Sequence, residues 1–146
     1  MTEQEQAQRA AVVAEARAWL GTPYHHHGAV KGVGVDCAML PIAVYHACGL
    51  MPLIDPRPYP VDWMMNRSDE IYMGVVEQYA HAVEQPLPGD FALWQFGRTF
   101  SHGGIVIEWP LVVHAYQPLR QVAYSRADQG RLSTRPVRYY SLWGNG

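Results

Sequence analysis

One cysteine has the setting that thiol chemistry requires. Cys37 follows a glycine-rich loop at 21–36 and opens an apolar run that is typical of a helix. Because Pro41 cannot donate a hydrogen bond to the carbonyl of Cys37, the helix is expected to begin near 36–38. The pKa of a thiol falls at a helix N-terminus and beside an imidazole, and the thiolate is the nucleophile. Cys37 is therefore a candidate nucleophile for acyl transfer, and its unpaired backbone N–H could help bind an oxyanion.

Two histidines could supply the base for this thiol. His102 and His114 lie in two apolar runs that a turn near 108–110 would join into a hairpin. A turn centred on Trp109 makes His102 the diagonal neighbour of His114, with backbone positions about 7–8 Å apart. A turn centred on Glu108 places the two directly opposite each other. In both registers the imidazoles share one face, so one ring could take the thiol proton while the other fixes its tautomer. The alternative is a pair of histidines that only cap a sheet edge.

The second cysteine and the histidine triplet have simpler explanations. Cys48 lies in the same expected helix as Cys37, about 16 Å away, which is too far for a disulfide, so both thiols are expected to be free. His25, His26 and His27 are consecutive in the loop, and adjacent side chains cannot all point one way. We expect them to contact a substrate at the rim of the site. No metal site is predicted, and thiol–imidazole chemistry needs no cofactor.

The elements that must position these residues follow from periodicity and turn signals. A capping box and an apolar stripe predict a helix over 3–20, and further helices are predicted over 37–49 and 69–83. Residues 90–143 contain short β-rich runs separated by turn residues. Helices first and strands later predict an α+β fold with an antiparallel sheet, in a single domain over 1–146.

Composition narrows the classes of partner. The chain of 146 residues is 49% hydrophobic and 16% charged, with a formal net charge of −2. It can therefore bury a sizeable core, and it has no basic run interleaved with aromatics that would indicate nucleic acid. No apolar stretch reaches the roughly 20 residues that a membrane span needs. The polar N-terminus is unlike a signal peptide, so we expect synthesis in the cytoplasm.

Taken in order, several short motifs resemble those of the NlpC/P60 cysteine peptidases, in particular the phage cell-wall peptidase branch. The matching segments are Ala18-Trp19-Leu20-Gly21-Thr22-Pro23-Tyr24, Gly34-Val35-Asp36-Cys37, Pro86-Leu87-Pro88-Gly89-Asp90, Ser101-His102-Gly103-Gly104-Ile105 and Val113-His114-Ala115-Tyr116. Each motif is weak alone, whereas the ordered set is specific and spans most of the chain.

The resemblance implies a fold, a reaction and the principal roles. The fold would be papain-like, with N-terminal helices packed on a five- to six-stranded antiparallel sheet. The reaction would be hydrolysis of an amide bond in peptidoglycan stem peptides, between D-γ-glutamyl and a diamino acid. Cys37 would be the nucleophile, His102 the general base and then acid, and His114 the residue that orients His102.

The resemblance also implies residues that contact the substrate. Tyr24 matches a tyrosine that helps form the oxyanion and substrate site, while Asp36 and Ser101 match positions that contact the amino end of the stem peptide. The chain departs from the family after the cysteine, where Ala38 and Met39 replace the usual serine and glycine.

Two further functions remain open at this stage. The chain could be a phage tail-assembly or tail-tip component that uses the fold as an interaction module, with phage tail proteins as its partners. It could also be an amidase or acyltransferase on another substrate, since a thiol–imidazole pair does not dictate the acyl group. For the leading hypothesis we expect a phage or prophage protein that is carried in the virion tail or released to the cell wall.

Overall fold

The chain folds as an α+β protein, as its sequence predicts. The computed structural model describes residues 1–55, 74, 76–97 and 99–144. In chain order the elements are α1 (Glu3–Ala18), β1 (Ala29–Val30), β2 (Gly34–Val35), α2 (Met39–Ala47), β3 (His81–Val83), β4 (Phe91–Phe96), β5 (Thr99–Glu108), β6 (Leu111–Tyr116), η2 (Gln117–Leu119), β7 (Gln121–Arg126), η3 (Gly130–Thr134) and β8 (Val137–Ser141).

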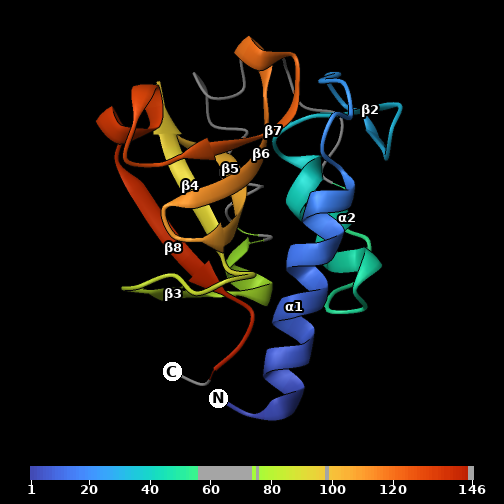
Figure 1. Cartoon of the computed structure of the whole chain (residues 1–146), viewed down its shortest axis with the longest axis vertical. Coiled ribbons are helices and arrows are strands. Elements are labelled where there is room, and N and C mark those ends of the chain that lie inside the picture. Colours follow the sequence, from blue (N-terminus) through green and yellow to red (C-terminus); the bar gives the residue numbers. More distant parts are fainter. Residues whose placement is uncertain (56–73, 75, 98, 145–146) are drawn as a thin grey trace.

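Six of the strands form one antiparallel sheet. Their order is β3-β8-β4-β5-β6-β7, and the short strands β1 and β2 pair separately. Helices α1 and α2 lie side by side against the sheet (Figure 1). The predicted papain-like arrangement of N-terminal helices on a five- to six-stranded sheet is confirmed, with six strands. No helix in the described part of the chain is long and apolar enough to cross a membrane.

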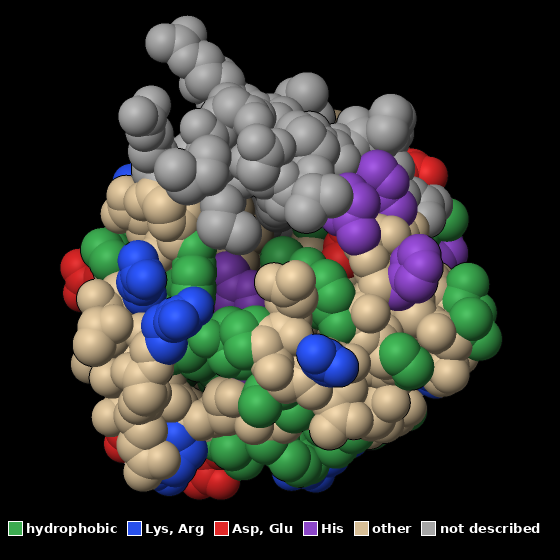
Figure 2. Space-filling model, turned by 90° about the horizontal axis from the view of Figure 1, so that it is seen from above, with side chains coloured by type: hydrophobic (Ala, Val, Ile, Leu, Met, Phe, Trp, Pro, Cys, Tyr) green, Lys and Arg blue, Asp and Glu red, His purple; other side chains and the backbone are tan. Residues whose placement is uncertain are grey.

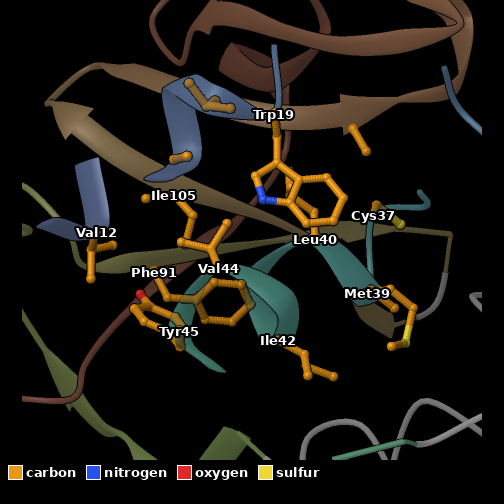
Figure 3. Packing of buried hydrophobic residues seen from close by; sticks show 14 of the residues in the cluster. Val12, Trp19, Cys37, Met39, Leu40, Ile42, Val44, Tyr45, Phe91 and Ile105 are labelled. Atoms are coloured by element: carbon orange, nitrogen blue, oxygen red, sulfur yellow. The ribbon is translucent and has the colours of Figure 1, made fainter. Parts of the chain in front are cut away.

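The main core lies between the helices and the sheet. Figure 3 shows Val12 of α1 and Val44 of α2 close to Ile105 of β5, and Cys37 belongs to the same cluster. A second cluster, which includes Trp94, is formed by side chains that alternate with those of the first along β4. Strand β4 is therefore buried on both faces, and it pairs along its length with β5, which carries His102.

A buried ion pair fastens α1 to the start of the sheet. The guanidinium of Arg9 lies 2.8 Å from the Asp90 carboxylate, and Arg9 also donates to the carbonyl of Pro88 at 3.0 Å. The other carboxylate oxygen of Asp90 accepts from the N–H of Leu87 at 2.8 Å. Asp90 thus closes the turn before β4 and anchors the helix, which gives the proline-glycine-aspartate motif a structural reason.

The carboxylate of Asp36 organises the start of α2. Its Oδ1 accepts from the N–H of Met39 at 2.9 Å, and its carbonyl accepts from the N–H of Leu40 at 3.1 Å. The first helical residue is Met39, so Cys37 lies in the turn that opens the helix. Pro41 occupies the first turn, where a missing N–H costs little. The predicted start near 36–38 is confirmed.

The helix predicted over 69–83 is wrong at its end. Much of that range lies outside the described residues, and helical structure is present at 76–79. Residues 81–83 instead form β3, in which His81 pairs with Ser141 of β8. An edge strand this short carries no periodicity of its own, so the sequence could not separate it from the preceding helix.

Candidate active site

The β5–β6 hairpin brings His102 and His114 into contact. Ile105 pairs with Val113, which is the register of a turn centred on Trp109, so the two histidines are diagonal neighbours on one face. The turn itself is Trp109-Pro110, because Glu108 pairs with Leu111 after a register shift beyond Val106. The Nε2 of His102 lies 2.7 Å from the Nδ1 of His114. Of the two registers that the sequence left open, the Trp109-centred one is right, and both histidines do face each other as predicted.

The histidine contact continues into β7, which the sequence did not indicate. The Nε2 of His114 lies 2.7 Å from the Oγ of Ser125. Because His114 pairs with Ala123, Ser125 is its diagonal neighbour on the next strand. The only available signal was the register of β7, and nothing in the local sequence fixes that register.

Small residues after His102 allow the strands to approach closely. A Cβ placed on Gly103 would lie 2.5 Å from the ring of Phe91. One placed on Gly104 would lie 3.2 Å from the carbonyl oxygen of Val113. The two glycines of this motif therefore serve the packing of the strand that carries His102.

Aromatic side chains enclose the histidine pair. The ring of Phe96 meets His102 edge-on at a centroid distance of 5.1 Å, and Trp94 lies 6.0 Å away. Tyr116 stacks on His114 at 4.9 Å. These rings fix both imidazoles in orientation and remove water from around them.

Burial keeps both imidazoles neutral. His102 is 7% exposed and His114 is fully buried. Burial first, and then the proximity of His114, hold the pKa of His102 well below its ordinary value. Burial lowers the pKa of His114 to about 4. Near neutral pH each ring therefore carries one N–H donor and one lone pair.

Cys37 meets this strand from the opening turn of α2. Its Sγ lies 3.9 Å from the carbonyl oxygen of Ser101, the residue before His102. The pKa of the thiol is raised to about 12, mainly because the sulfur is buried and secondly because Asp36 is charged. Hydrogen bonds from Tyr24 and from two backbone N–H groups lower this pKa but do not offset the rise. The prediction that the helix start would lower this pKa is wrong for the resting site. The sequence shows the helix start but not the depth at which the sulfur is buried.

Tyr24 stands beside the sulfur, as the resemblance implied. Its backbone is held by a bridge to Val35 of β2 and by its N–H, which donates to the carbonyl of Arg120 at 2.9 Å. Burial first, and then Cys37, raise the pKa of the Tyr24 hydroxyl. The phenol therefore stays protonated and available as a hydrogen-bond donor.

Asp36 is more deeply committed to the fold than the sequence indicated. It is 1% exposed, and in addition to its bonds at the start of α2 its Oδ2 accepts from the N–H of His27 at 2.8 Å. The Nδ1 of His26 lies 3.9 Å from the same oxygen. Asp36 therefore joins the histidine loop to the cysteine turn, while its charge remains beside the site.

Ser101 carries a polar atom that the fold leaves unused. Its Oγ is buried and, within the described part of the chain, has no hydrogen-bond partner. Because leaving a buried hydroxyl unpaired costs about 1–3 kcal/mol, this atom is well placed to bond a ligand. The substrate contact that the resemblance implies for Ser101 stays a prediction.

One cleft of about 340 Å³ joins these side chains. It is lined by Tyr24, His26, Asp36, Cys37, Ala38, Phe96, Ser101, His102, Ala115, Tyr116, Gln117, Pro118 and Arg131. Five of the six predicted site residues line it, and the sixth, His114, lies behind His102. Figure 2 looks onto a hollowed face where a histidine lies among hydrophobic side chains, with Lys and Arg side chains on one side and a group of histidines on the other.

The cleft has two sides of different origin. We call Tyr24, His26, Asp36, Cys37 and Ala38 the cysteine wall, because loop 21–36 and the start of α2 provide it. We call Phe96, His102, Tyr116 and Arg131 the histidine wall, because the sheet and the neighbouring η3 provide it. Sequence reasoning did not identify Arg131, which lies in a short 3-10 helix without a motif.

The histidine triplet divides between the rim and the loop. His26 lines the cleft, whereas the expected contact with a substrate at its rim stays a prediction. The backbone of His27 has a φ of 67°, and the Nδ1 of His25 lies 2.9 Å from the carbonyl of His26. Among the described residues, no group of three or more His, Cys, Asp or Glu side chains could hold a metal ion.

Comparison with solved structures identifies the fold. The NlpC/P60 domain of the peptidoglycan hydrolase SagA matches with a TM-score of 0.58 and 23% identity, over 89% of this chain and 96% of that one. NlpC2 from Trichomonas vaginalis matches with a TM-score of 0.69 and 16% identity, over 94% of this chain and 47% of that one. RipD from Mycobacterium tuberculosis, a non-catalytic NlpC/P60 domain protein adapted to peptidoglycan binding, matches with a TM-score of 0.59 and 14% identity, over 93% and 98%.

These likenesses show that the chain has the fold of NlpC/P60 domains. No family model and no curated protein matches the sequence. The chain spans less than half the length of several of the solved structures it resembles, between 39% and 47% of each. Since SagA is a hydrolase and RipD is non-catalytic, the fold alone does not assign an activity.

Proposed function

We propose that this chain is an NlpC/P60 cysteine peptidase that hydrolyses an amide bond in peptidoglycan stem peptides. One observation carries the proposal: Cys37 and His102 open onto the same cleft, and His114 holds His102 from behind at 2.7 Å. A thiol, a base and an orienting group are the parts that nucleophilic acyl transfer requires.

The roles follow from which nitrogen of His102 is engaged. Since Nε2 is bonded to His114, Nδ1 is the atom that accepts the proton of Cys37. The Sγ–H bond breaks as sulfur attacks the carbonyl carbon, and His102 becomes an imidazolium. Because burial favours the neutral thiol and the neutral imidazole, proton transfer accompanies the attack and no ion pair forms beforehand.

The tetrahedral intermediate then breaks down in two steps. Its oxyanion is bound by the Tyr24 hydroxyl and the backbone N–H of Cys37. The C–N bond breaks as His102 returns its proton to the leaving amine. Water, deprotonated by the same Nδ1, attacks the thioester and releases the acid together with the free thiol.

The charges of the cleft support a substrate with two ends of opposite sign. The cysteine wall carries the Asp36 carboxylate and binds the acyl part of the substrate, where a free amine would be attracted. The histidine wall carries Arg131 on the leaving-group side, where a guanidinium suits a carboxylate. A D-γ-glutamyl–diamino acid bond fits this arrangement, because the leaving amino acid bears a carboxylate.

Purified protein tests this proposal directly. The full chain, Cys37→Ala and Cys48→Ala would be incubated with γ-linked stem peptides and their α-linked isomers, and the products weighed by mass spectrometry. We expect the full chain and Cys48→Ala to cleave the γ-linked peptide and Cys37→Ala to leave it intact. No Cys37-dependent cleavage of any stem peptide would overturn the proposal. Transfer of the acyl group to an added amine in place of water would favour the acyltransferase alternative.

We further propose that the peptidase acts in a phage or prophage setting, from the virion tail or after release to the cell wall. The ordered motifs that resemble the phage cell-wall peptidase branch support this setting. Immunodetection of the protein in purified virions tests it. A virion that contains Cys37→Ala and assembles normally but penetrates peptidoglycan poorly is the expected result, whereas failed assembly would favour the tail-component function.

A further inference from the structure

A chain of two short hydrogen bonds leads from the cleft to β7. The Nε2 of His102 contacts the Nδ1 of His114, and the Nε2 of His114 contacts the Oγ of Ser125, each at 2.7 Å. Ser125 is half-buried and lines an open depression of about 500 Å³ that also includes Tyr116 and Arg131. The serine is therefore the end of this hydrogen-bonded chain that meets solvent in the neighbouring depression, outside the lining of the cleft.

Neutral imidazoles allow only two proton arrangements along this chain. In the first, His102 donates from Nε2 to His114, and His114 donates from Nε2 to the oxygen of Ser125. In the second, the Ser125 hydroxyl donates to His114, and His114 donates from Nδ1 to His102. Each ring carries a single proton, so the first arrangement leaves a lone pair on Nδ1 of His102 and the second places a proton there.

We propose that Ser125 is a positioning residue that accepts the proton of His114 and thereby holds His102 in the tautomer whose Nδ1 can take the thiol proton. The tautomer assignment is independent of the proposed function. Its use in peptide cleavage rests on that function. Only the first arrangement gives Cys37 a base, because a protonated Nδ1 has no lone pair. A wrong tautomer at a nucleophile's base is costly even where the geometry is intact.

The surroundings of Ser125 make acceptance from His114 favourable. The hydroxyl can rotate its own proton into the open depression, where water accepts it, so it loses no hydrogen bond by accepting from His114. In the opposite arrangement the serine oxygen could accept a hydrogen bond only from solvent. The Nδ1 of His102 would then carry a proton and would have no lone pair facing the cleft. Burial of both rings also disfavours the doubly protonated imidazolium. Each ring therefore remains in one of its two neutral tautomers.

Three substitutions test whether Ser125 acts as a hydrogen-bond acceptor or only packs against His114. Ser125→Ala removes the oxygen, Ser125→Thr keeps a hydroxyl on a strand residue, and Ser125→Asp supplies an oxygen that can only accept near neutral pH. The first readout is the ¹⁵N NMR signature of the His102 tautomer. The second is the rate at which iodoacetamide alkylates Cys37, measured in a Cys48→Ala background so that a single thiol reports.

We expect Ser125→Ala to populate the Nδ1–H tautomer of His102 and to slow alkylation by roughly tenfold, a partial loss of the about 10²–10⁴-fold that a positioned general base contributes. Ser125→Thr and Ser125→Asp should keep the Nε2–H tautomer and a rate near that of the parent protein. Ser133→Ala is the matched control, because its hydroxyl bonds the carbonyl of Gly130 and contacts neither histidine.

An unchanged tautomer and an unchanged alkylation rate in folded Ser125→Ala would overturn the inference. Equal losses in the Ala, Thr and Asp variants would also overturn it, since they would indicate packing alone. Both readouts work without a peptide substrate. A protein that shows the tautomer shift but cleaves no stem peptide would therefore refute the proposed function and leave the role of Ser125 standing.

Discussion

The two walls of the cleft are built by different means. The histidine wall rests on four strands whose ladder places His102, His114 and Ser125 by register alone. The cysteine wall is a loop held by backbone bonds, such as that from the Tyr24 N–H to Arg120, and a helix start that the Asp36 carboxylate joins to this loop. The proposed base is therefore placed by the ladder of a sheet, whereas the proposed nucleophile is placed by a loop and one carboxylate.

Burial has opposite effects on the titrating groups of the two walls, with a common result. It raises the pKa of the Cys37 thiol and lowers the pKa of both histidines, so that the acid and the base are neutral together. Desolvation disfavours the charged form of each group whatever its sign. In the proposed reaction, proton transfer therefore accompanies the attack, so that both walls act at the same moment.

The largest effect is expected when either wall loses its reacting group. Cys37→Ala and His102→Ala should each lower kcat by roughly 10⁴-fold or more, and the double variant should be no slower than either one. Steady-state cleavage of a γ-linked stem peptide measures this. Additive losses in the double variant would contradict the proposal, since they would mean that the two walls act independently.

The histidine wall was largely predictable from the sequence, and the reason is geometrical. Both turns considered put His102 and His114 on one face, because their pairings differ by two residues and side chains alternate along a strand. The shared face still depends on the register, since Glu108 pairs with Leu111 and a register shift before Glu108 restores the pairing of Ile105 with Val113. Choosing between the turns needed the structure, and so did Ser125, whose place depends on the pairing of a third strand. Periodicity within one segment says nothing about the register between segments.

The cysteine wall was predictable in its residues but not in its electrostatics. Pro41 correctly fixed where the helix starts, and therefore where Cys37 lies. The direction of the thiol pKa was wrong, because it depends on how deeply the sulfur is buried and on the nearby charge of Asp36. The anchoring role of Asp36 was also hidden, since it arises from a bond to the loop at His27.

A second difference between the walls is their response to acid. The pKa of His114 is lowered to about 4 in the folded protein, so the unfolded chain binds a proton that the folded one excludes. Stability is therefore present above pH 6.5 and lost as the pH falls toward 4, by about 3 kcal/mol for this residue alone. His102 contributes in the same direction.

Urea unfolding at pH 7 and pH 4.5 measures this response. His114→Leu removes the titrating ring, so its stability should change less between the two pH values than that of the parent protein. His46→Leu is the control, because His46 lies on the exposed side of α2. An equal fall in the parent protein and in His114→Leu would show that the histidine wall does not carry the acid sensitivity.

The cysteine wall should respond to Asp36 in two opposite ways. Asp36→Asn keeps one acceptor oxygen but loses the charge and leaves either the Met39 or the His27 N–H without its acceptor, so it should cost about 1–3 kcal/mol of stability. Removing the charge that raises the thiol pKa should speed alkylation of Cys37 by a few-fold, as a lower pKa implies. Peptide cleavage should fall, because the wall and its attraction for an amine are both weakened.

Parallel measurements of alkylation and cleavage separate these effects. A fall in both rates would mean that the loop has moved and that Asp36 acts only through the fold. A Glu15→Gln variant provides the comparison, since it removes a carboxylate from α1 that pairs with Lys31 outside the cleft.

The smallest effect is expected at Arg131, at the exposed end of the histidine wall. Arg131→Ala should raise KM by a few-fold for a substrate with a free carboxylate on its leaving group and leave kcat nearly unchanged, because an exposed charge pair contributes about 1 kcal/mol or less. The same substrate with that carboxylate amidated should bind both proteins alike.

Arg126→Ala is the matched control, because this arginine pairs with Asp128 and lies outside the cleft. Added salt should shrink the difference, as it does for any exposed attraction. An equal rise in KM for the amidated substrate would show that Arg131 does not bind the carboxylate. The preference of the cleft for a substrate with two charged ends would then depend on Asp36 in the cysteine wall alone.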